Sequence, residues 1–398
     1  MISVVKNGTV TSPQGFRAGA TSAGIKYEGR LDLGILCSER PATVAGVFTR
    51  NAVKSAPVQL SALRVSRGIA RAVVANSGCA NACTGDRGLN DAASMASIVA
   101  TSFGFAPEDV LVASTGVIGT FIPLDRVAGG VAGIKLDSHG GDDFAHAIMT
   151  TDTTCKQIAV AAGTHPASFT IGAAAKGSGM IHPNMGTMLS FITTDASVER
   201  GFLAAALSRC ADLTFNMVSV DGDTSPSDTL VVLANGLAGN ATFDANNGAE
   251  FEEALLYVCE HLAKAVAADG EGATRLLEVT VTGAVSIEDA RLAARTIASS
   301  PLVKTAINGA DPNWGRVVCA AGRSGAVMDP EKTSMTLCGE PVMSRGMPVP
   351  FDDEALRVRL KADKVTVCVD LALGVGCATA WGCDLSHDYV TINASYTT

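Results

Sequence analysis

The sequence has few charged and few aromatic residues, and it lacks any long apolar run. Of its 398 residues, 17% are charged and 5% are aromatic, and the formal net charge is −9. Because Lys and Arg form no cluster, the chain has no basic surface for a phosphate backbone, and we expect no nucleic-acid partner. No apolar stretch approaches the roughly 18 residues that suggest a transmembrane helix, so we expect no membrane association.

Patterns of disulfide and metal-binding proteins are also missing. The cysteines number eleven, which is odd, and the six histidines are scattered. Neither a CxxC pair nor a pair of histidines at metal-ligand spacing occurs, so we expect no metal ion. Cys319 and Cys368 lie in apolar segments, which predicts reduced, buried thiols in a cytoplasmic protein. The N-terminal segment also lacks the basic and apolar regions of a secretory signal.

The chain is instead rich in small and aliphatic residues. It has 41 glycines, and its mean hydropathy is +0.28. This composition is typical of a compact protein with a large buried interior and excludes a disordered chain. A length of 398 residues suggests two or three lobes.

Strand-like and helical segments alternate along most of the chain, which predicts an α/β fold. The clearest helix covers 249–268, with acidic residues in its first turn and Lys264 near its end. From about Leu276 the alternation starts again, so 276–398 is predicted to form a smaller C-terminal α/β lobe. The other predicted helices are 91–103 and 198–213, and the other predicted strands are 71–76, 110–115, 157–162, 168–173, 187–195, 215–220 and 229–236.

Eight polar or Gly-rich segments interrupt this apolar pattern. Loops held by a rigid sheet often contain binding and catalytic residues, although each segment taken alone is more simply interpreted as a turn. No phosphate-binding loop, nucleophile elbow or HExxH zinc motif is present. The segments are 76–85, 114–119, 149–156, 176–188, 219–229, 269–275, 309–316 and 391–398.

Taken together and in order, these segments resemble the ornithine acetyltransferase family, also called glutamate N-acetyltransferase. The resemblance covers essentially the whole chain. It implies an α/β fold of layered sheets and helices, and a self-cleaving enzyme of arginine biosynthesis that needs no metal or organic cofactor. The matching runs are STGVIG, MTTDT, KGSGMIHPNMGTMLSFITTDA, VDGDTSPSDT, DGEGATR, DPNWGRV and INASYTT.

The resemblance implies self-cleavage at the Gly186–Thr187 bond. The products are an α fragment of residues 1–186 and a β fragment of residues 187–398, which are expected to stay associated as a heterotetramer of two α and two β chains. The family has alanine where this chain has Gly186. Because glycine tolerates strained backbone conformations, cleavage is still expected.

A threonine at a new N-terminus combines a nucleophile with a base. Its hydroxyl is a weak nucleophile until a base lies beside it, and the free α-amine, with an ordinary pKa near ~7.7, is such a base. The resemblance therefore assigns the nucleophile to Thr187. Without the surrounding motif, this residue would be interpreted as an ordinary strand threonine.

Other site residues follow from the resemblance as well. Thr115 and Gly116 come after a predicted strand and match the family's oxyanion hole, although a simple strand-ending turn is the alternative. Lys176 matches a lysine that binds a substrate carboxylate. Glu271 either holds the side-chain ammonium of ornithine or orients the catalytic amine. The positions that match substrate-binding residues are Thr150, Lys176, Thr187, Glu271, Asn393 and Thr398.

The predicted reaction is a double displacement between small amino-acid substrates. Thr187 takes the acetyl group of N2-acetylornithine, ornithine leaves, and the amine of glutamate attacks the ester to give N-acetylglutamate. Three alternatives stay open: an amidohydrolase or aminopeptidase on a similar scaffold, a secondary-metabolite acetyltransferase of the same family, and a non-enzymatic amino-acid-binding protein. An additional amino-acid N-acetyltransferase activity with acetyl-CoA is also open. The lack of a phosphate-binding cradle near these segments predicts that acetylornithine is much the better donor and that acetyl-CoA works poorly or not at all.

Overall fold

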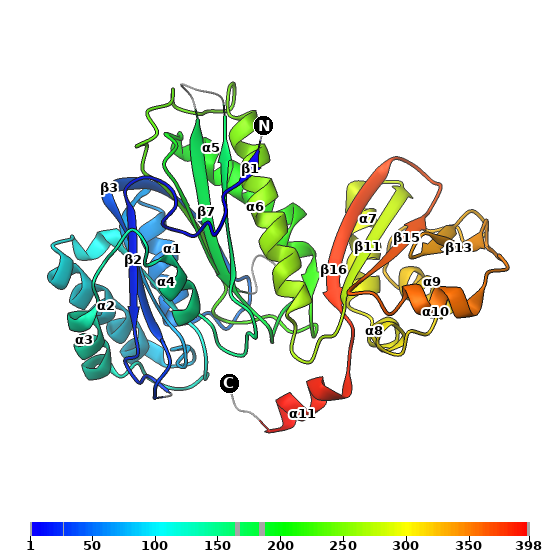
Figure 1. Ribbon diagram of the computed structural model, residues 1–398, viewed down its shortest axis with the longest axis horizontal. Helices are drawn as coiled ribbons and strands as arrows, with labels where there is room; N and C mark the ends of the chain where they lie inside the picture. Colours follow the sequence, from blue (N-terminus) through cyan, green and yellow to red (C-terminus); the bar gives the residue numbers. More distant parts are fainter. Residues whose placement is uncertain (1, 27, 164–167, 183–187, 396–398) are drawn as a thin grey trace.

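The computed structural model describes residues 2–26, 28–163, 168–182 and 188–395. Two mixed sheets and the helices that cover them make up this part of the chain (Figure 1). Among the described helices, none has both the length and the hydropathy that crossing a bilayer requires. The predicted α/β alternation is therefore confirmed.

The first sheet contains nine strands within the described residues, in the order β1-β6-β7-β8-β10-β3-β4-β5, with β2 beside β3. Its central strands β8 and β10 are buried along their whole length, as expected for strands covered on both faces. The strands are β1 (Ser3–Val4), β2 (Phe16–Thr21), β3 (Leu33–Phe48), β4 (Ile69–Asn76), β5 (Val110–Ser114), β6 (Lys156–Ala162), β7 (Phe169–Lys176), β8 (Leu189–Thr194) and β10 (Thr229–Ala234).

Strands from distant parts of the sequence alternate in the middle of this sheet. Strand β8 pairs antiparallel with β7, with Leu189 opposite Lys176. It also pairs parallel with β10, which in turn pairs antiparallel with β3. Strands β8 and β10 are therefore inserted between two strands from the first half of the chain.

Helices cover both faces of the first sheet. Phe191 of β8 points to α4 (Gly141–Ala147), where its ring meets the ring of Phe144 edge-on at 5.3 Å. The neighbouring Ile192 belongs to the buried cluster on the other face, which includes α5 (Arg200–Leu213) and α6 (Ala249–Ala268). The helices near the outer strands are α1 (Ala56–Val65), α2 (Gly85–Phe103) and α3 (Leu124–Gly133).

The second sheet contains seven strands within the described residues, in the order β14-β13-β12-β15-β11-β16-β9. Its strands are β9 (Val218–Ser219), β11 (Leu276–Ala284), β12 (Ser334–Leu337), β13 (Glu340–Ser344), β14 (Met347–Pro348), β15 (Lys364–Asp370) and β16 (Gly376–Cys383). The helices of this region are α7 (Ile287–Ala298), α8 (Pro301–Asn308), α9 (Trp314–Gly322), α10 (Asp353–Arg359) and α11 (His387–Ser395).

Helix α6 lies between the two sheets (Figure 1). Its Lys264 forms an ion pair with Glu278 of β11 and lies over the ring of Trp381 in β16. One cluster of buried side chains continues from the first sheet through α5 and α6 to the second sheet. The two sheets therefore share a hydrophobic core.

Two sequence-based predictions differ from the structure. The predicted strand 215–220 is a 3-10 turn at Phe215–Met217 followed by the two-residue β9, because the N–H of Met217 bonds back to Thr214. All eleven cysteines are described and are free thiols, but Cys319 and Cys368 are exposed rather than buried. Cys368 points outward because the side chains of β15 alternate, and its neighbours on both sides are buried valines.

Candidate active site

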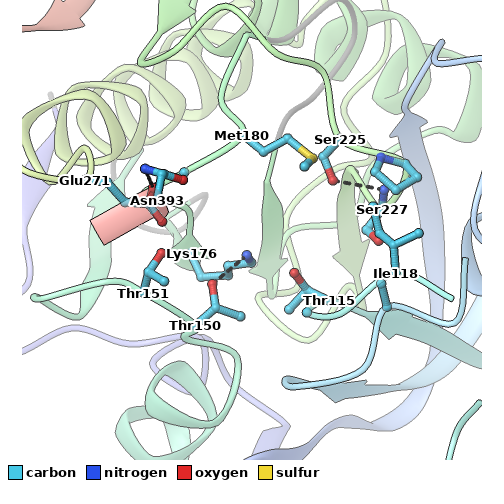
Figure 2. Close-up of a pocket in the computed structure, with 14 residues that line it drawn as sticks. Thr115, Ile118, Thr150, Thr151, Lys176, Met180, Ser225, Ser227, Glu271 and Asn393 are labelled. Carbon is cyan, nitrogen blue, oxygen red and sulfur yellow. Dashed lines mark hydrogen bonds between the residues drawn. The ribbon is translucent and has the colours of Figure 1, made fainter. Parts of the chain in front are cut away.

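A cavity of about 100 Å³ opens among loops of both halves of the chain. It collects six of the residues that the sequence predicted for the site, from positions as far apart as 115 and 393. Figure 2 shows Glu271 and Asn393 at one end of the cavity, Thr115 and Ile118 at the other, and Lys176 between them. The six predicted residues are Thr115, Gly116, Thr150, Lys176, Glu271 and Asn393.

Three predicted residues, Gly186, Thr187 and Thr398, lie outside the described residues. The described chain resumes at Met188, which lines a smaller cavity together with Thr115, Lys176 and Asp228. The two cavities share Thr115 and Lys176 in their linings. The residue that follows Thr187 in the sequence is therefore part of the same site.

The loop after β5 holds Thr115 and Gly116 against a neighbouring backbone. Strand β5 is buried throughout, and the N–H of Thr115 donates to the carbonyl oxygen of Asn76 at 3.0 Å. Gly116 has φ +127°, and a Cβ at this position would lie only 2.4 Å from the carbonyl carbon of Gly78. Glycine is required here both by the backbone angle and by the close approach of two loops.

Lys176 ends β7 with its side chain buried beside the cavity. It is 8% exposed, and its Nζ donates to Oγ1 of Thr150 at 3.1 Å. Burial lowers the pKa of Lys176, while the negative charges of Asp152, Asp228 and Glu271 act in the opposite direction. The amine of Lys176 thus lies among three acidic side chains.

Glu271 follows α6 and is also buried, at 7% exposure. Its Oε2 accepts a hydrogen bond from Nδ2 of Asn393 in α11 at 2.8 Å. Gly179 leaves room for this carboxylate, because a Cβ there would lie 2.4 Å from Oε1 of Glu271. A negative group is therefore fixed at one end of the cavity.

Asp228 is a buried acid that the sequence did not single out. It directly precedes the buried strand β10, and its side chain approaches Lys176 and the backbone of Met188. Burial raises the pKa of Asp228 well above its usual range. Within the described part of the chain, its Oδ2 has no hydrogen-bond partner. An acidic residue immediately before the mostly apolar strand TLVVLA was the available signal.

The polar segment 309–316 does not line the cavity. It connects α8 to α9, and its Asp311 lies 3.7 Å from Arg357 of α10. Residues 309–313 form a turn and a short loop, and residues 314–316 are the start of α9.

Comparison with known proteins identifies the family. The model of the ArgJ family matches residues 17–398. The arginine biosynthesis bifunctional protein ArgJ of Dehalococcoides mccartyi is 51% identical, with 100% of this chain and 99% of that protein covered. The protein of the same name from Bacillus subtilis is 44% identical, with 98% and 97% covered. The chain belongs to the ArgJ family.

A solved structure of an ArgJ protein agrees with this assignment. The crystal structure of the arginine biosynthesis bifunctional protein ArgJ from Bacillus halodurans is 47% identical with a TM-score of 0.50, covering 51% of this chain and 97% of that one. The crystal structure of ornithine acetyltransferase complexed with ornithine from Mycobacterium tuberculosis is 42% identical with a TM-score of 0.44, covering 46% of this chain and 100% of that one. The predicted family and its fold are confirmed, and this ArgJ-family chain is an acyltransferase of arginine biosynthesis.

Proposed function

We propose that this chain transfers an acetyl group from N2-acetylornithine to glutamate through an acetyl ester on Thr187. The observation that supports this most directly is the cavity itself. It combines Thr115 and Gly116, a buried cation at Lys176 and a fixed carboxylate at Glu271, and it adjoins Met188, the residue after the nucleophile. Family membership favours this function over the amidohydrolase and binding-protein alternatives. The 51% identical relative that is named an arginine biosynthesis protein favours it over the secondary-metabolite alternative.

In the first half of the reaction, the α-amine of Thr187 takes the proton of its own hydroxyl, and the oxygen attacks the acetyl carbonyl. The oxyanion that forms accepts hydrogen bonds from the Thr115 hydroxyl and the Gly116 N–H, and each bond stabilises the transition state by ~3 kcal/mol. Ornithine leaves as its nitrogen takes the proton. In the second half, the amine of glutamate attacks the ester by the reverse steps.

The charges of the cavity match the substrates. Both amino acids have an α-carboxylate, for which Lys176 is the buried cation among the lining residues. The side-chain ammonium of ornithine is matched by Glu271, whose carboxylate is held by Asn393. Of the two roles open for Glu271, binding this ammonium fits its position at the end of the cavity (Figure 2).

Self-cleavage between Gly186 and Thr187 creates the nucleophile in this proposal. The Thr187 hydroxyl attacks the Gly186 carbonyl, the peptide C–N bond breaks, and water hydrolyses the resulting ester. The match to the solved ArgJ structure covers 97% of that chain but only 51% of this one. This is consistent with a protein made of two shorter chains. Strands β8 and β10 lie between β7 and β3, so the fragments stay paired after cleavage. We further propose the heterotetramer of two α and two β chains and a cytoplasmic location.

A second activity is also part of the proposal. The relatives are named bifunctional, and we propose that acetyl-CoA acetylates the same Thr187. A cavity of about 100 Å³ admits an acetyl group and leaves the nucleotide outside. The missing phosphate cradle is therefore weaker evidence against this donor than the sequence suggested.

Electrophoresis and mass spectrometry test the main proposal. Denatured wild-type protein should give two fragments, and Thr187→Ala should give one inactive chain of 40.5 kDa. Incubation with N2-acetylornithine alone should add one acetyl group to the β fragment, and two-substrate kinetics should give parallel lines. A fully active, uncleaved enzyme, or intersecting lines without an acetylated fragment, would refute the mechanism.

A further inference from the structure

Three charged side chains form a buried network beside the cavity. Nζ of Lys156 lies 2.6 Å from Oδ1 of Asp152 and 2.5 Å from Oδ2 of Asp269. The three side chains are between 0% and 7% exposed. The network has one negative charge in excess. None of the three residues was singled out from the sequence, because Lys156 and Asp269 are 113 positions apart.

Asp152 connects two of the loops that line the cavity. Its Oδ2 accepts the backbone N–H of Thr150 at 3.0 Å, and its Oδ1 accepts the backbone N–H of Gly177 at 2.7 Å. Lys176 closes a ring, because its Nζ donates to the side chain of Thr150. One carboxylate thus fixes the loop of Thr150 relative to the loop that begins at Lys176.

Asp269 connects the third loop. Its carboxylate accepts hydrogen bonds from the backbone and the hydroxyl of Thr153. Its carbonyl oxygen accepts the Ser178 hydroxyl at 2.7 Å, and the N–H of Glu271 donates to the carbonyl oxygen of Ser178. The loops of Thr150, Lys176 and Glu271 are therefore held together through Lys156.

Global stability alone is a weak explanation for such a network. The free energy needed to remove two charges from water is about as large as their attraction in a buried ion pair. Well-packed apolar residues in the same place therefore often stabilise a protein equally. A fixed charge does have a direct effect on a neighbouring ionisable group. Lys176 is that neighbour, and the charged groups facing it are Asp152, Asp228, Glu271 and Lys156.

We propose that Asp152 is a positioning residue of the acetyl transfer, which holds the Thr150 and Lys176 loops together and supplies the negative charge that keeps Lys176 cationic. Lys156 and Asp269 fix the carboxylate of Asp152 in place. The inference rests on the proposed role of Lys176 in binding the substrate carboxylate.

The test compares two variants that should shift the pH profile in opposite directions. In single-turnover acetylation by N2-acetylornithine, Asp152→Asn should move the alkaline limb to lower pH, because a negative charge beside Lys176 is lost. Lys156→Met should move this limb to higher pH, because the positive charge of Lys156 opposes protonation of Lys176. Asp152→Asn should also raise KM about tenfold and change kcat much less, since a charge-assisted contact is weakened.

Asp195→Asn is the matched control. Asp195 is 3% exposed and accepts hydrogen bonds from the backbone N–H groups of Gln14 and Thr170. It follows the C-terminal end of β8, whereas Lys176 pairs with the first residue of that strand. It should lose stability without a change in KM or in the alkaline limb. Lys176→Met should abolish the limb and so identifies the group that titrates.

The inference would be overturned if the alkaline limb stayed in place in both Asp152→Asn and Lys156→Met, or if it moved in the same direction in both. Normal wild-type turnover would in that case leave the proposed function intact. If Asp152→Asn fails to fold, the upward shift in Lys156→Met still decides the question. A wild-type enzyme that forms no acetyl ester would instead refute the proposed function.

Discussion

Replacing Gly116 with alanine should displace the backbone N–H that we propose as an oxyanion donor, without touching the nucleophile. The new Cβ would lie 2.4 Å from the carbonyl carbon of Gly78 and 2.7 Å from the nitrogen of Cys79. Both atoms belong to the backbone, so no change of rotamer relieves the overlap, and the loop must move. Because the loss of an oxyanion-hole donor costs roughly 10²–10³ in kcat, we expect kcat and kcat/KM to fall together by about that factor.

Gly119→Ala separates this effect from simple backbone strain. Gly119 lies in the same loop with φ +82°, and a Cβ there would meet no atom within 4 Å. Alanine in this left-handed conformation costs on the order of 1–2 kcal/mol. The control should therefore lose some thermal stability and keep its kcat.

The assay measures N-acetylglutamate formation from N2-acetylornithine and glutamate, with thermal unfolding and circular dichroism on the same samples. A Gly116→Ala variant that folds and keeps kcat within about threefold of wild type would show that its N–H is not an oxyanion donor of the expected strength. An equal loss of kcat in Gly119→Ala would assign the effect to the loop as a whole.

Further predictions concern the substrate pocket, pH and the donor. Gly179→Ala should push the carboxylate of Glu271 aside and so raise KM for N2-acetylornithine. Glu271→Gln should raise the same KM. An unchanged KM in both variants would exclude Glu271 from ornithine binding. Because burial raises the pKa of Asp228, the unfolded chain releases this proton at lower pH than the folded one. Stability should therefore fall as pH rises from about 4 through the folded-state pKa, and Asp228→Asn should flatten this slope in thermal unfolding. Acetyl-CoA should acetylate glutamate in wild type but not in Thr187→Ala, and activity that survives in the variant would place the second reaction at another site.

Local patterns in the sequence predict elements more reliably than contacts. Helix α6 covers Ala249–Ala268, as predicted, because its acidic first turn and apolar face are local signals. The segment 215–220 is equally apolar but too short between α5 and β10 to decide between strand and turn. The outward position of Cys368 depends on which face of β15 is covered, which only the tertiary fold determines.

The site residues were predicted because their motifs resemble those of a family. Thr115, Lys176 and Glu271 line one cavity as the resemblance implies. The partners of these residues were not predicted, because Asp152 and Asp269 meet only through Lys156 after the loops have folded together. In a chain with few charges, Asp and Lys inside polar segments were the signal that pointed to them.

The insertion of β8 and β10 between β7 and β3 has a consequence for how an enzyme cleaved as we propose would survive denaturation. An intact chain brings these strands together in an intramolecular reaction. Once the Gly186–Thr187 bond is cut, the same pairing joins two separate polypeptides, and the lost translational freedom makes it depend on concentration. Recovery of native wild-type enzyme after dilution from denaturant should therefore fall with dilution, whereas that of Thr187→Ala should not. Under the proposed self-cleavage, the covalent connection would therefore assist folding only before the bond is cut.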